Sequence, residues 1–253
     1  MNIFNTLLLG VVEGVSEFLP VSSTAHLILT AKLLAIQDSE FLKSFEIIIQ
    51  LGAILAVVTL YFKSFFDISR MKVVVAGFIP TAVLGLVFYK AVKSLLGDVY
   101  VVLASLLIGG VIMILFEKYS RHDEVRSEVT IRDAVKIGCF QALAFIPGTS
   151  RSAATIIGGM LLGISRPVIA EFSFLLAVPT MFAASALDIW KNKSVILNGN
   201  VVYLLVGFVT AYIVAMFSIK VFINYLKKHD FKPFGVYRIA ISIVGFVIIY
   251  SSL

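Results

Sequence analysis

Six stretches of this chain are long and apolar enough to cross a lipid bilayer as α-helices. A spanning helix needs about 20 predominantly apolar residues, because the hydrocarbon core contains no water to solvate a polar backbone. The composition agrees, since 60% of the 253 residues are hydrophobic, 14% are charged and the mean hydropathy is +1.02. The sequence therefore predicts an all-α integral membrane protein with six transmembrane helices, over residues 42–62, 73–92, 99–116, 167–190, 201–222 and 234–252.

The charges, the single cysteine and the N-terminal segment exclude several classes of partner, site and targeting signal. The net charge of +6 could indicate nucleic acid, but the basic residues lie between the apolar spans, where anionic lipid headgroups and orientation signals explain them better. Cys139 alone excludes an intramolecular disulfide and a cysteine-cluster metal site. The N-terminal segment lacks a basic region, and Glu13 and Glu17 interrupt its apolar run, so it is not a cleavable signal peptide.

Two further apolar regions are interrupted near their middles. Residues 3–35 are broken by PVSST, which begins at Pro20, and residues 133–165 are broken by PGTSRS, which begins at Pro147. Each half is a helix of roughly three turns, too short to cross the hydrocarbon alone. Non-helical backbone at membrane depth is tolerated only where protein or a polar cavity surrounds it. We therefore expect two re-entrant helix–loop–helix hairpins.

The two halves of the chain resemble each other. With an offset of 127, FLPVSS at 18–23 falls on FIPGTS at 145–150. Each half has one hairpin followed by three spans, and three crossings place the halves in opposite orientations. We expect one membrane domain over residues 1–253, made of a first repeat (1–116), a cytoplasmic linker (117–132) and a second, inverted repeat (133–253). In transporters, interrupted segments at matching positions of such repeats mark the substrate site.

Basic loops set the expected orientation. Loops 63–72, 117–136 and 223–233 fall on one side of this topology and hold most of the lysines and arginines. The side richer in these residues is expected to be cytoplasmic. Both termini and the mouth of the first hairpin then face outward.

The first hairpin carries acids, hydroxyls and a histidine. Glu13 and Glu17 are four residues apart and share a helix face, and carboxylates at membrane depth are functional candidates by default. The alternative is a structural ion pair, for which Arg151 is the one strongly cationic candidate that we expect at depth. Ser23 and His26 add a nucleophile and a base, although an isolated histidine is more often a packed residue. Two more hydroxyls flank Ser23, those of Ser22 and Thr24.

The second hairpin has the features of an anion site. Arg151 is always charged, and its planar fork suits phosphate or carboxylate. The half-helix that follows begins close to it, so free N–H groups and the helix dipole also favour an anion. Ordinary N-capping explains one hydroxyl here, but it does not explain an arginine placed in the membrane. The expected phosphate-binding loop comprises Gly148, Thr149, Ser150, Arg151 and Ser152.

Neither hairpin loop is a complete site alone, so we expect the two tips to meet near the membrane midplane. Glu13 and Glu17 could together hold Mg²⁺ or Ca²⁺, since both ions prefer oxygen ligands and bridge phosphates. The sequence does not decide between the metals, and the site could also work without one. Three other polar residues are weaker candidates for lining the cavity or bridging helices: Glu46, Gln50 and Glu171.

At these residues the chain resembles the bacterial undecaprenyl pyrophosphate phosphatase family, often called the bacitracin resistance protein. EGVSEFLPVSSTAHL at 13–27 and PGTSRSAAT at 147–155 match its two signatures, and the resemblance covers essentially the whole chain. One departure is Ala153, where family members usually carry glycine. The family's functional positions fall on Glu13, Glu17, Ser23, His26, Ser150, Arg151 and Thr155.

The resemblance implies hydrolysis of a C55 polyprenyl diphosphate to the monophosphate and inorganic phosphate, in the bacterial plasma (inner) membrane. This reaction recycles the lipid carrier for peptidoglycan synthesis and confers bacitracin resistance. The active site is expected to open to the outer, periplasmic side. The sequence leaves the oligomeric state open, a homodimer included.

We assign catalysis to Glu13, Glu17, Ser23, His26 and Arg151, and substrate binding to Ser22, Thr24, Gly148, Thr149, Ser150, Ser152 and Thr155. The nucleophile is left open between Ser23, His26 and water. The competing function is a transporter or flippase of a polyprenyl phosphate lipid. The glutamate pair with a serine and a histidine favours chemistry, because binding alone needs no base.

Overall fold

The computed structural model describes residues 1–88, 91, 95, 98–119, 126–191, 196 and 199–251, so residues 120–125 of the expected linker lie outside it. Over the described residues the elements are helical, apart from an isolated β-bridge between Arg126 and Ile164. Within these described ranges, six helices are long and apolar enough to cross a membrane: α3 (Glu40–Leu60), α4 (Ile68–Val87), α6 (Val99–Tyr119), α9 (Arg166–Lys191), α11 (Val201–Leu226) and α12 (Lys232–Ser251).

These helices confirm the six predicted spans. The largest difference is at α4, which begins five residues before the expected start. Asp67 explains the earlier start, because its side chain caps the helix by accepting hydrogen bonds from the N–H groups of Ser69 and Arg70. A 3₁₀ turn, η1 (Phe62–Phe66), leads from α3 to α4. The chain is a multi-pass membrane protein.

Four of the helices in the described part of the chain are too short to span. They are α1 (Ile3–Ser16), α2 (Ser23–Leu33), α7 (Ile131–Gln141) and α8 (Arg151–Leu161), and the 3₁₀ turn η2 (Ala142–Phe145) continues α7. At 1.5 Å per residue, an 11-residue helix such as α2 is about 16 Å long, roughly half of the hydrocarbon thickness. α1 packs against α2, and α7 packs against α8. Both predicted helix–loop–helix units are therefore present as local structures.

The two loops share an uncommon cap. Ser22 and Ser150 are the N-caps of α2 and α8, with φ of 70° and 72°, and each accepts a hydrogen bond from the backbone N–H three residues later. Pro20 and Pro147 are 127 residues apart, but the two capping serines are 128 apart. The second loop is thus one residue longer, and it contains Gly148 with φ of 91°.

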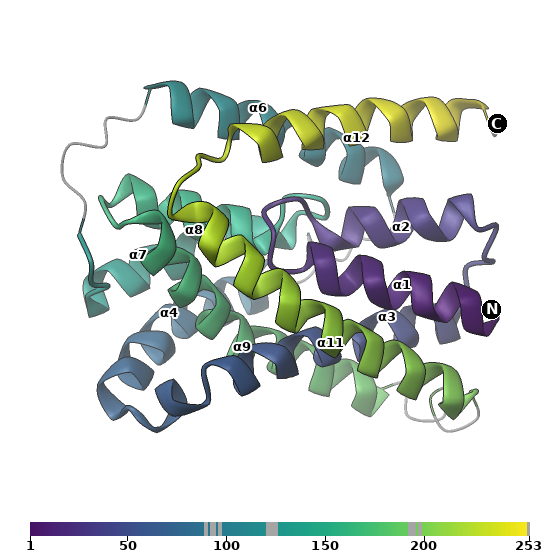
Figure 1. Ribbon diagram of the computed structural model, residues 1–253, viewed down its shortest axis with the longest axis horizontal. Coiled ribbons are helices and arrows are strands. Elements are labelled where there is room, and N and C mark those ends of the chain that lie inside the picture. The colour runs from purple at the N-terminus through teal and green to yellow at the C-terminus, as the bar shows by residue number, and fades with distance from the viewer. Residues whose placement is uncertain are drawn as a thin grey trace.

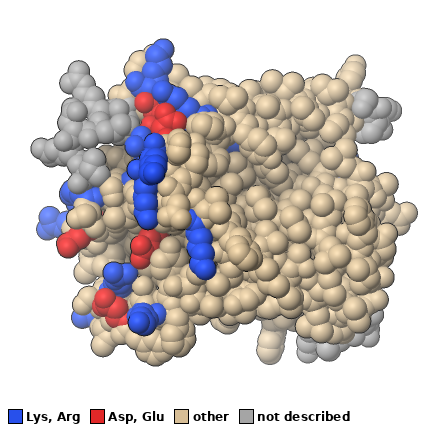
Figure 2. Space-filling model, in the orientation of Figure 1, with Lys and Arg blue, Asp and Glu red and all other residues tan. Residues whose placement is uncertain are grey.

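The helices lie roughly along one axis, with both termini at the same end (Figure 1). α6 lies beside α12, and α11 packs against α1 and α3. Charged side chains gather at the end opposite the termini, and the rest of the visible surface is almost free of them (Figure 2). Leu86 and Phe217 are among many large hydrophobic side chains that face outward. A surface of this kind suits lipid rather than water.

Candidate active site

The tips of the two helix–loop–helix units meet at a cavity of about 240 Å³. A direct hydrogen bond joins the tips, because the Ser152 hydroxyl donates to the Leu19 carbonyl at 2.8 Å. The cavity walls come from both loops and from α3, α4, α7 and α9. They comprise Glu17, Ser22, Ser23, Thr24, Gln50, Thr81, Gln141, Ala144, Phe145, Pro147, Gly148, Ser150, Arg151, Thr180, Met181 and Ala184.

Glu17 lies between a hydroxyl and a guanidinium. The Ser23 hydroxyl donates to one carboxylate oxygen at 2.5 Å, and Nη2 of Arg151 donates to the other at 3.3 Å. The first contact stays within one loop, and the second crosses from α8 to the end of α1. A hydroxyl, a carboxylate and a guanidinium are therefore in direct contact at the place where the two tips meet.

Arg151 is held in place but retains a free donor. Nη1 donates to the Ser173 carbonyl at 2.9 Å, and the guanidinium lies over the Phe18 ring with Cζ 5.9 Å from its centroid. The Nε–H has no partner among the described residues, although it is buried. Thr155 supports this arrangement indirectly, because its hydroxyl lies 2.6 Å from the Ser173 hydroxyl. Arg151 also lines the cavity, where its positive charge and planar fork favour an anion.

Glu13 is fully buried beside these groups. Neither of its carboxylate oxygens has a hydrogen-bond partner in the described part of the chain, and its charged neighbours are Glu17, Glu46 and Arg151. A buried carboxylate without donors, beside that of Glu17, fits a divalent cation, which takes one or two carboxylates and completes its shell with water and phosphate oxygens. Within the described ranges, no cluster of three or more His, Cys, Asp and Glu side chains forms a closed metal cage.

The remaining polar residues of the second loop have different surroundings. Ser150 lines the cavity, and its hydroxyl caps α8 by accepting from the Ala153 N–H at 3.2 Å. Ser152 and Thr155 are fully buried and bond to neighbouring segments rather than facing the cavity. Gly148 is required because a Cβ there would overlap the Val102 carbonyl of α6. Of the five residues of the predicted phosphate-binding loop, Gly148, Ser150 and Arg151 line the cavity, whereas Thr149 and Ser152 do not.

His26 points away from the cavity. Its Nδ1 bonds to the Ser22 carbonyl at 2.8 Å, and its Nε2 bonds to the Tyr237 hydroxyl of α12 at 2.7 Å. A carbonyl only accepts, so Nδ1 carries the hydrogen and Nε2 faces the phenol. In this arrangement His26 bonds to neither Ser23 nor Glu17. It fixes the residue that precedes Ser23 at the start of α2.

Sequence reasoning missed three polar residues of the cavity wall. The Gln141 side-chain amide donates to the hydroxyls of Thr81 and Thr180, at 3.0 Å each, and thereby connects α7 with α4 and α9. Its carbonyl oxygen is buried without a partner among the described residues. The signal was available, because a glutamine at membrane depth usually binds across helices or lines a cavity. Gln50, named as a weaker candidate, also lines the cavity.

The expectation that Arg151 is the one strong cation at depth is wrong. Arg238 on α12 is also fully buried, with an exposed fraction of 0%. It lies inside the span predicted at 234–252, where an arginine should have been treated as a functional candidate. Its surroundings are backbone carbonyls, which no local sequence pattern reveals.

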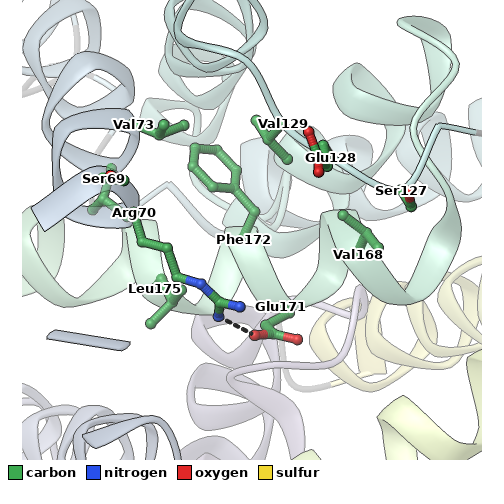
Figure 3. Close-up of a pocket in the computed structure, with 11 residues that line it drawn as sticks. Ser69, Arg70, Val73, Ser127, Glu128, Val129, Val168, Glu171, Phe172 and Leu175 are labelled. Carbon is green, nitrogen blue, oxygen red and sulfur yellow. Dashed lines mark hydrogen bonds and ion pairs between the residues drawn. The ribbon is translucent and has the colours of Figure 1, made fainter. Parts of the chain in front are cut away.

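A larger cavity of about 460 Å³ lies among α4, α9 and residues 127–129, near Arg126 and Asp133 of the charged end. Figure 3 shows the Arg70 guanidinium meeting Glu171 in this cavity, at 3.2 Å. This pair is half exposed and neutralises its own charge. Arg70 also donates to the Ser64 hydroxyl at 3.2 Å, but among the described residues no hydroxyl donates to Glu171. The smaller cavity, where a hydroxyl and an arginine both contact one carboxylate, is therefore the better candidate for chemistry.

Comparisons with known proteins agree with the motifs. The family model described as "Bacitracin resistance protein BacA" matches residues 6–244. The chain is 50% identical over 251 residues to an undecaprenyl-diphosphatase of Sulfurihydrogenibium sp. (strain YO3AOP1), covering 98% of this chain and 99% of the relative. It is also 50% identical over 250 residues to the enzyme of that name from Aquifex aeolicus (strain VF5), covering 96% and 97% of the two chains. A similar protein from Persephonella marina is 48% identical over 256 residues and is matched over 98% of both chains.

Proposed function

This chain belongs to the BacA family of bacitracin resistance proteins, and from that premise we propose that it is an undecaprenyl-diphosphatase. It hydrolyses undecaprenyl diphosphate to the monophosphate and inorganic phosphate. The product is the lipid carrier that peptidoglycan synthesis reuses. The observation that carries this proposal is the direct contact of Ser23 and Arg151 with opposite oxygens of Glu17, at the cavity where the two tips meet.

The geometry supports a covalent route. The diphosphate enters the cavity while the prenyl chain stays in lipid, and Arg151 binds the terminal phosphate oxygens. Glu17 accepts the proton of Ser23 as its oxygen attacks the terminal phosphorus, and the bond to the bridging oxygen breaks. The lipid monophosphate leaves. Water then attacks the phosphoserine and releases inorganic phosphate. We prefer Ser23 to His26 as nucleophile, because Ser23 has the base in contact and His26 does not.

A divalent metal fits the same site. Glu13 and Glu17 would hold Mg²⁺ or Ca²⁺, since the Glu13 oxygens have no donor among the described residues and both ions favour carboxylate and phosphate oxygen. The ion would offset the negative charge of the diphosphate in the cavity. The chain's own contribution is the buried carboxylate pair that faces Arg151.

For the membrane arrangement, we propose that α1–α2 and α7–α8 are re-entrant hairpins of two inverted repeats, residues 1–116 and 133–253, within one domain. The helix lengths and the matching caps at Ser22 and Ser150 support this. The charged end, opposite both termini, is then cytoplasmic by the excess of lysine and arginine (Figure 2). The protein lies in the bacterial inner membrane, its site opens to the outer side, and a homodimer is compatible with this placement.

Phosphate release from a prenyl diphosphate by the purified protein in detergent tests the function. Arg151→Ala and Ser23→Ala should abolish most of the release, because the anion clamp or the nucleophile is missing. Arg70→Ala is the matched control, since Arg70 is also an ion-paired arginine but lies at the larger cavity. In detergent no membrane separates two compartments, so a transporter would bind the lipid without releasing phosphate. Full activity in Arg151→Ala would contradict the site assignment.

A further inference from the structure

Arg238 binds the backbone of both loop tips through a fully occupied guanidinium. The side chain of this α12 residue is completely buried. A guanidinium has five N–H donors. All five are used, one from Nε, two from Nη1 and two from Nη2, at 3.0–3.3 Å. The acceptors are five different carbonyls, those of Leu106, Pro20, Thr149, Ser105 and Gly148.

The five carbonyls belong to three separate segments. Pro20 lies in the first loop, and Gly148 and Thr149 lie in the second. Ser105 and Leu106 lie in α6, which runs beside α12 (Figure 1). Arg238 therefore links both tips to each other and to the α6–α12 pair. This link is separate from the contact between Ser152 and Leu19.

The two buried arginines differ in what they can still bind. Arg151 lines the cavity, so its guanidinium can bind a phosphate there directly. Arg238 has no donor left, and it is not among the residues that line the cavity. Removing a guanidinium from water is unfavourable, and here carbonyl dipoles replace the lost hydration. Arg238 therefore acts on the site through the loops rather than by touching the substrate.

The carbonyl bonds also fix the direction of backbone donors. In a trans peptide the C=O and the following N–H point to opposite sides. The Thr149 carbonyl points at Arg238, so the Ser150 N–H points away from it. Ser150 lines the cavity and is the N-cap of α8, and free N–H groups at the start of a helix favour an anion. The orientation of this donor thus depends on Arg238.

We propose that Arg238 is a positioning residue for the diphosphatase reaction. Arg238 binds the carbonyls of Pro20 in the first loop and of Gly148 and Thr149 in the second. It thereby keeps the two loops at a fixed separation, so that Ser23 and Arg151 can act on the same phosphate. This inference rests on the proposed function and adds a residue outside both sequence motifs to the site.

The first test is Arg238→Lys, measured by steady-state hydrolysis of a prenyl diphosphate in detergent. A lysine keeps the charge, but it has three donors on one atom, so at least two of the five carbonyls lose their hydrogen bond. We expect kcat to fall by about 100-fold, as for a displacement of reacting groups on the order of 1 Å. KM should stay within about threefold, because the tail and Arg151 still bind substrate.

Gly109→Ala tests the same link without changing the arginine. A Cβ on Gly109 would overlap the Arg238 guanidinium, so the guanidinium must shift from its carbonyls. The expected result is again a lower kcat with KM little changed.

Ser242→Ala is the matched control. Ser242 lies one turn after Arg238 on α12 and is also buried, and its hydroxyl donates to the Leu103 carbonyl of α6 at 2.7 Å. The substitution removes a bond between α12 and α6 but none to the loops. Its Tm should fall while kcat per folded protein stays at the wild-type value.

The outcomes separate this inference from the proposed function. If the wild-type protein released no phosphate, the function itself would be wrong. If the wild-type protein were active, and Arg238→Lys lost activity only in proportion to its folded fraction by size exclusion and thermal unfolding, Arg238 would be structural and the inference overturned. Equal loss of kcat in Ser242→Ala would also overturn it.

Discussion

The Ser23 hydroxyl donates to the Glu17 carboxylate over 2.5 Å, inside a loop that both residues flank. Glu17 ends α1 and Ser23 begins α2, so the turn between them brings a base to a hydroxyl six residues away. Arg151 contacts the same carboxylate from the other helix–loop–helix unit. Residues of both helix–loop–helix units therefore donate hydrogen bonds to the carboxylate of Glu17.

The first prediction concerns the covalent step. Rapid quenching of the enzyme with terminally ³²P-labelled prenyl diphosphate should trap label on Ser23. Glu17→Gln should lower kcat by about 10³-fold, because an amide cannot accept the serine proton and general bases contribute roughly 10²–10⁴. Glu171→Gln is the matched change at the larger cavity and should be neutral. Because both routes place one oxygen from water in the released phosphate, the trapped label decides between them. Single-turnover release of phosphate with no label on the protein at any time would show direct attack by water instead.

The second prediction concerns His26 and Tyr237. Tyr237→Phe removes one hydrogen bond at 2.7 Å, so kcat should fall by no more than about fivefold, the equivalent of about 1 kcal/mol. His26→Ala should cost more, because the bond that holds the Ser22 carbonyl is lost with the ring.

The pH–rate profile separates positioning from proton transfer by His26. A positioning role predicts that His26→Ala lowers the whole profile without changing its shape. Loss of one limb of the profile in His26→Ala would identify His26 as an acid or base in the reaction.

Much of the fold and of the candidate site could be predicted from the sequence, because charged residues are rare within membrane-spanning stretches and stand out there. An apolar stretch of 20 residues has few alternatives to a spanning helix, and Glu13 or Arg151 within apolar sequence is conspicuous. The sequence did not predict the contacts between residues that are far apart in the chain. Arg238 lies in a predicted span, and its partners are carbonyls at positions 20, 105, 106, 148 and 149, which any residue type supplies. The direction of the His26 ring depends on Tyr237, 211 residues away.

The third prediction concerns a metal. Chelation of divalent ions should abolish phosphate release, and Mg²⁺ or Ca²⁺ should restore it, because two adjacent buried carboxylates need a counter-charge beside a diphosphate. Glu13→Gln should raise the ion concentration needed for half-maximal activity by about 10–100-fold, since one of two carboxylate ligands is lost. Full activity after exhaustive chelation would mean that Arg151 alone offsets the substrate charge.

The last prediction concerns the turn of the second loop. Gly148 has φ of 91°, and a Cβ there would overlap the Val102 carbonyl, so Gly148→Ala meets both backbone strain and a clash. We expect it to destabilise the protein by about 1–3 kcal/mol and to displace Thr149 and Ser150, with a loss of kcat. Thermal unfolding in detergent and steady-state kinetics measure the two effects. Ala153→Gly, three residues into α8, is the matched change: it alters helix propensity by up to about 1 kcal/mol but leaves the turn intact. It should lower Tm slightly and keep kcat, whereas equal kinetic losses in both variants would show that the loop tolerates no change at all.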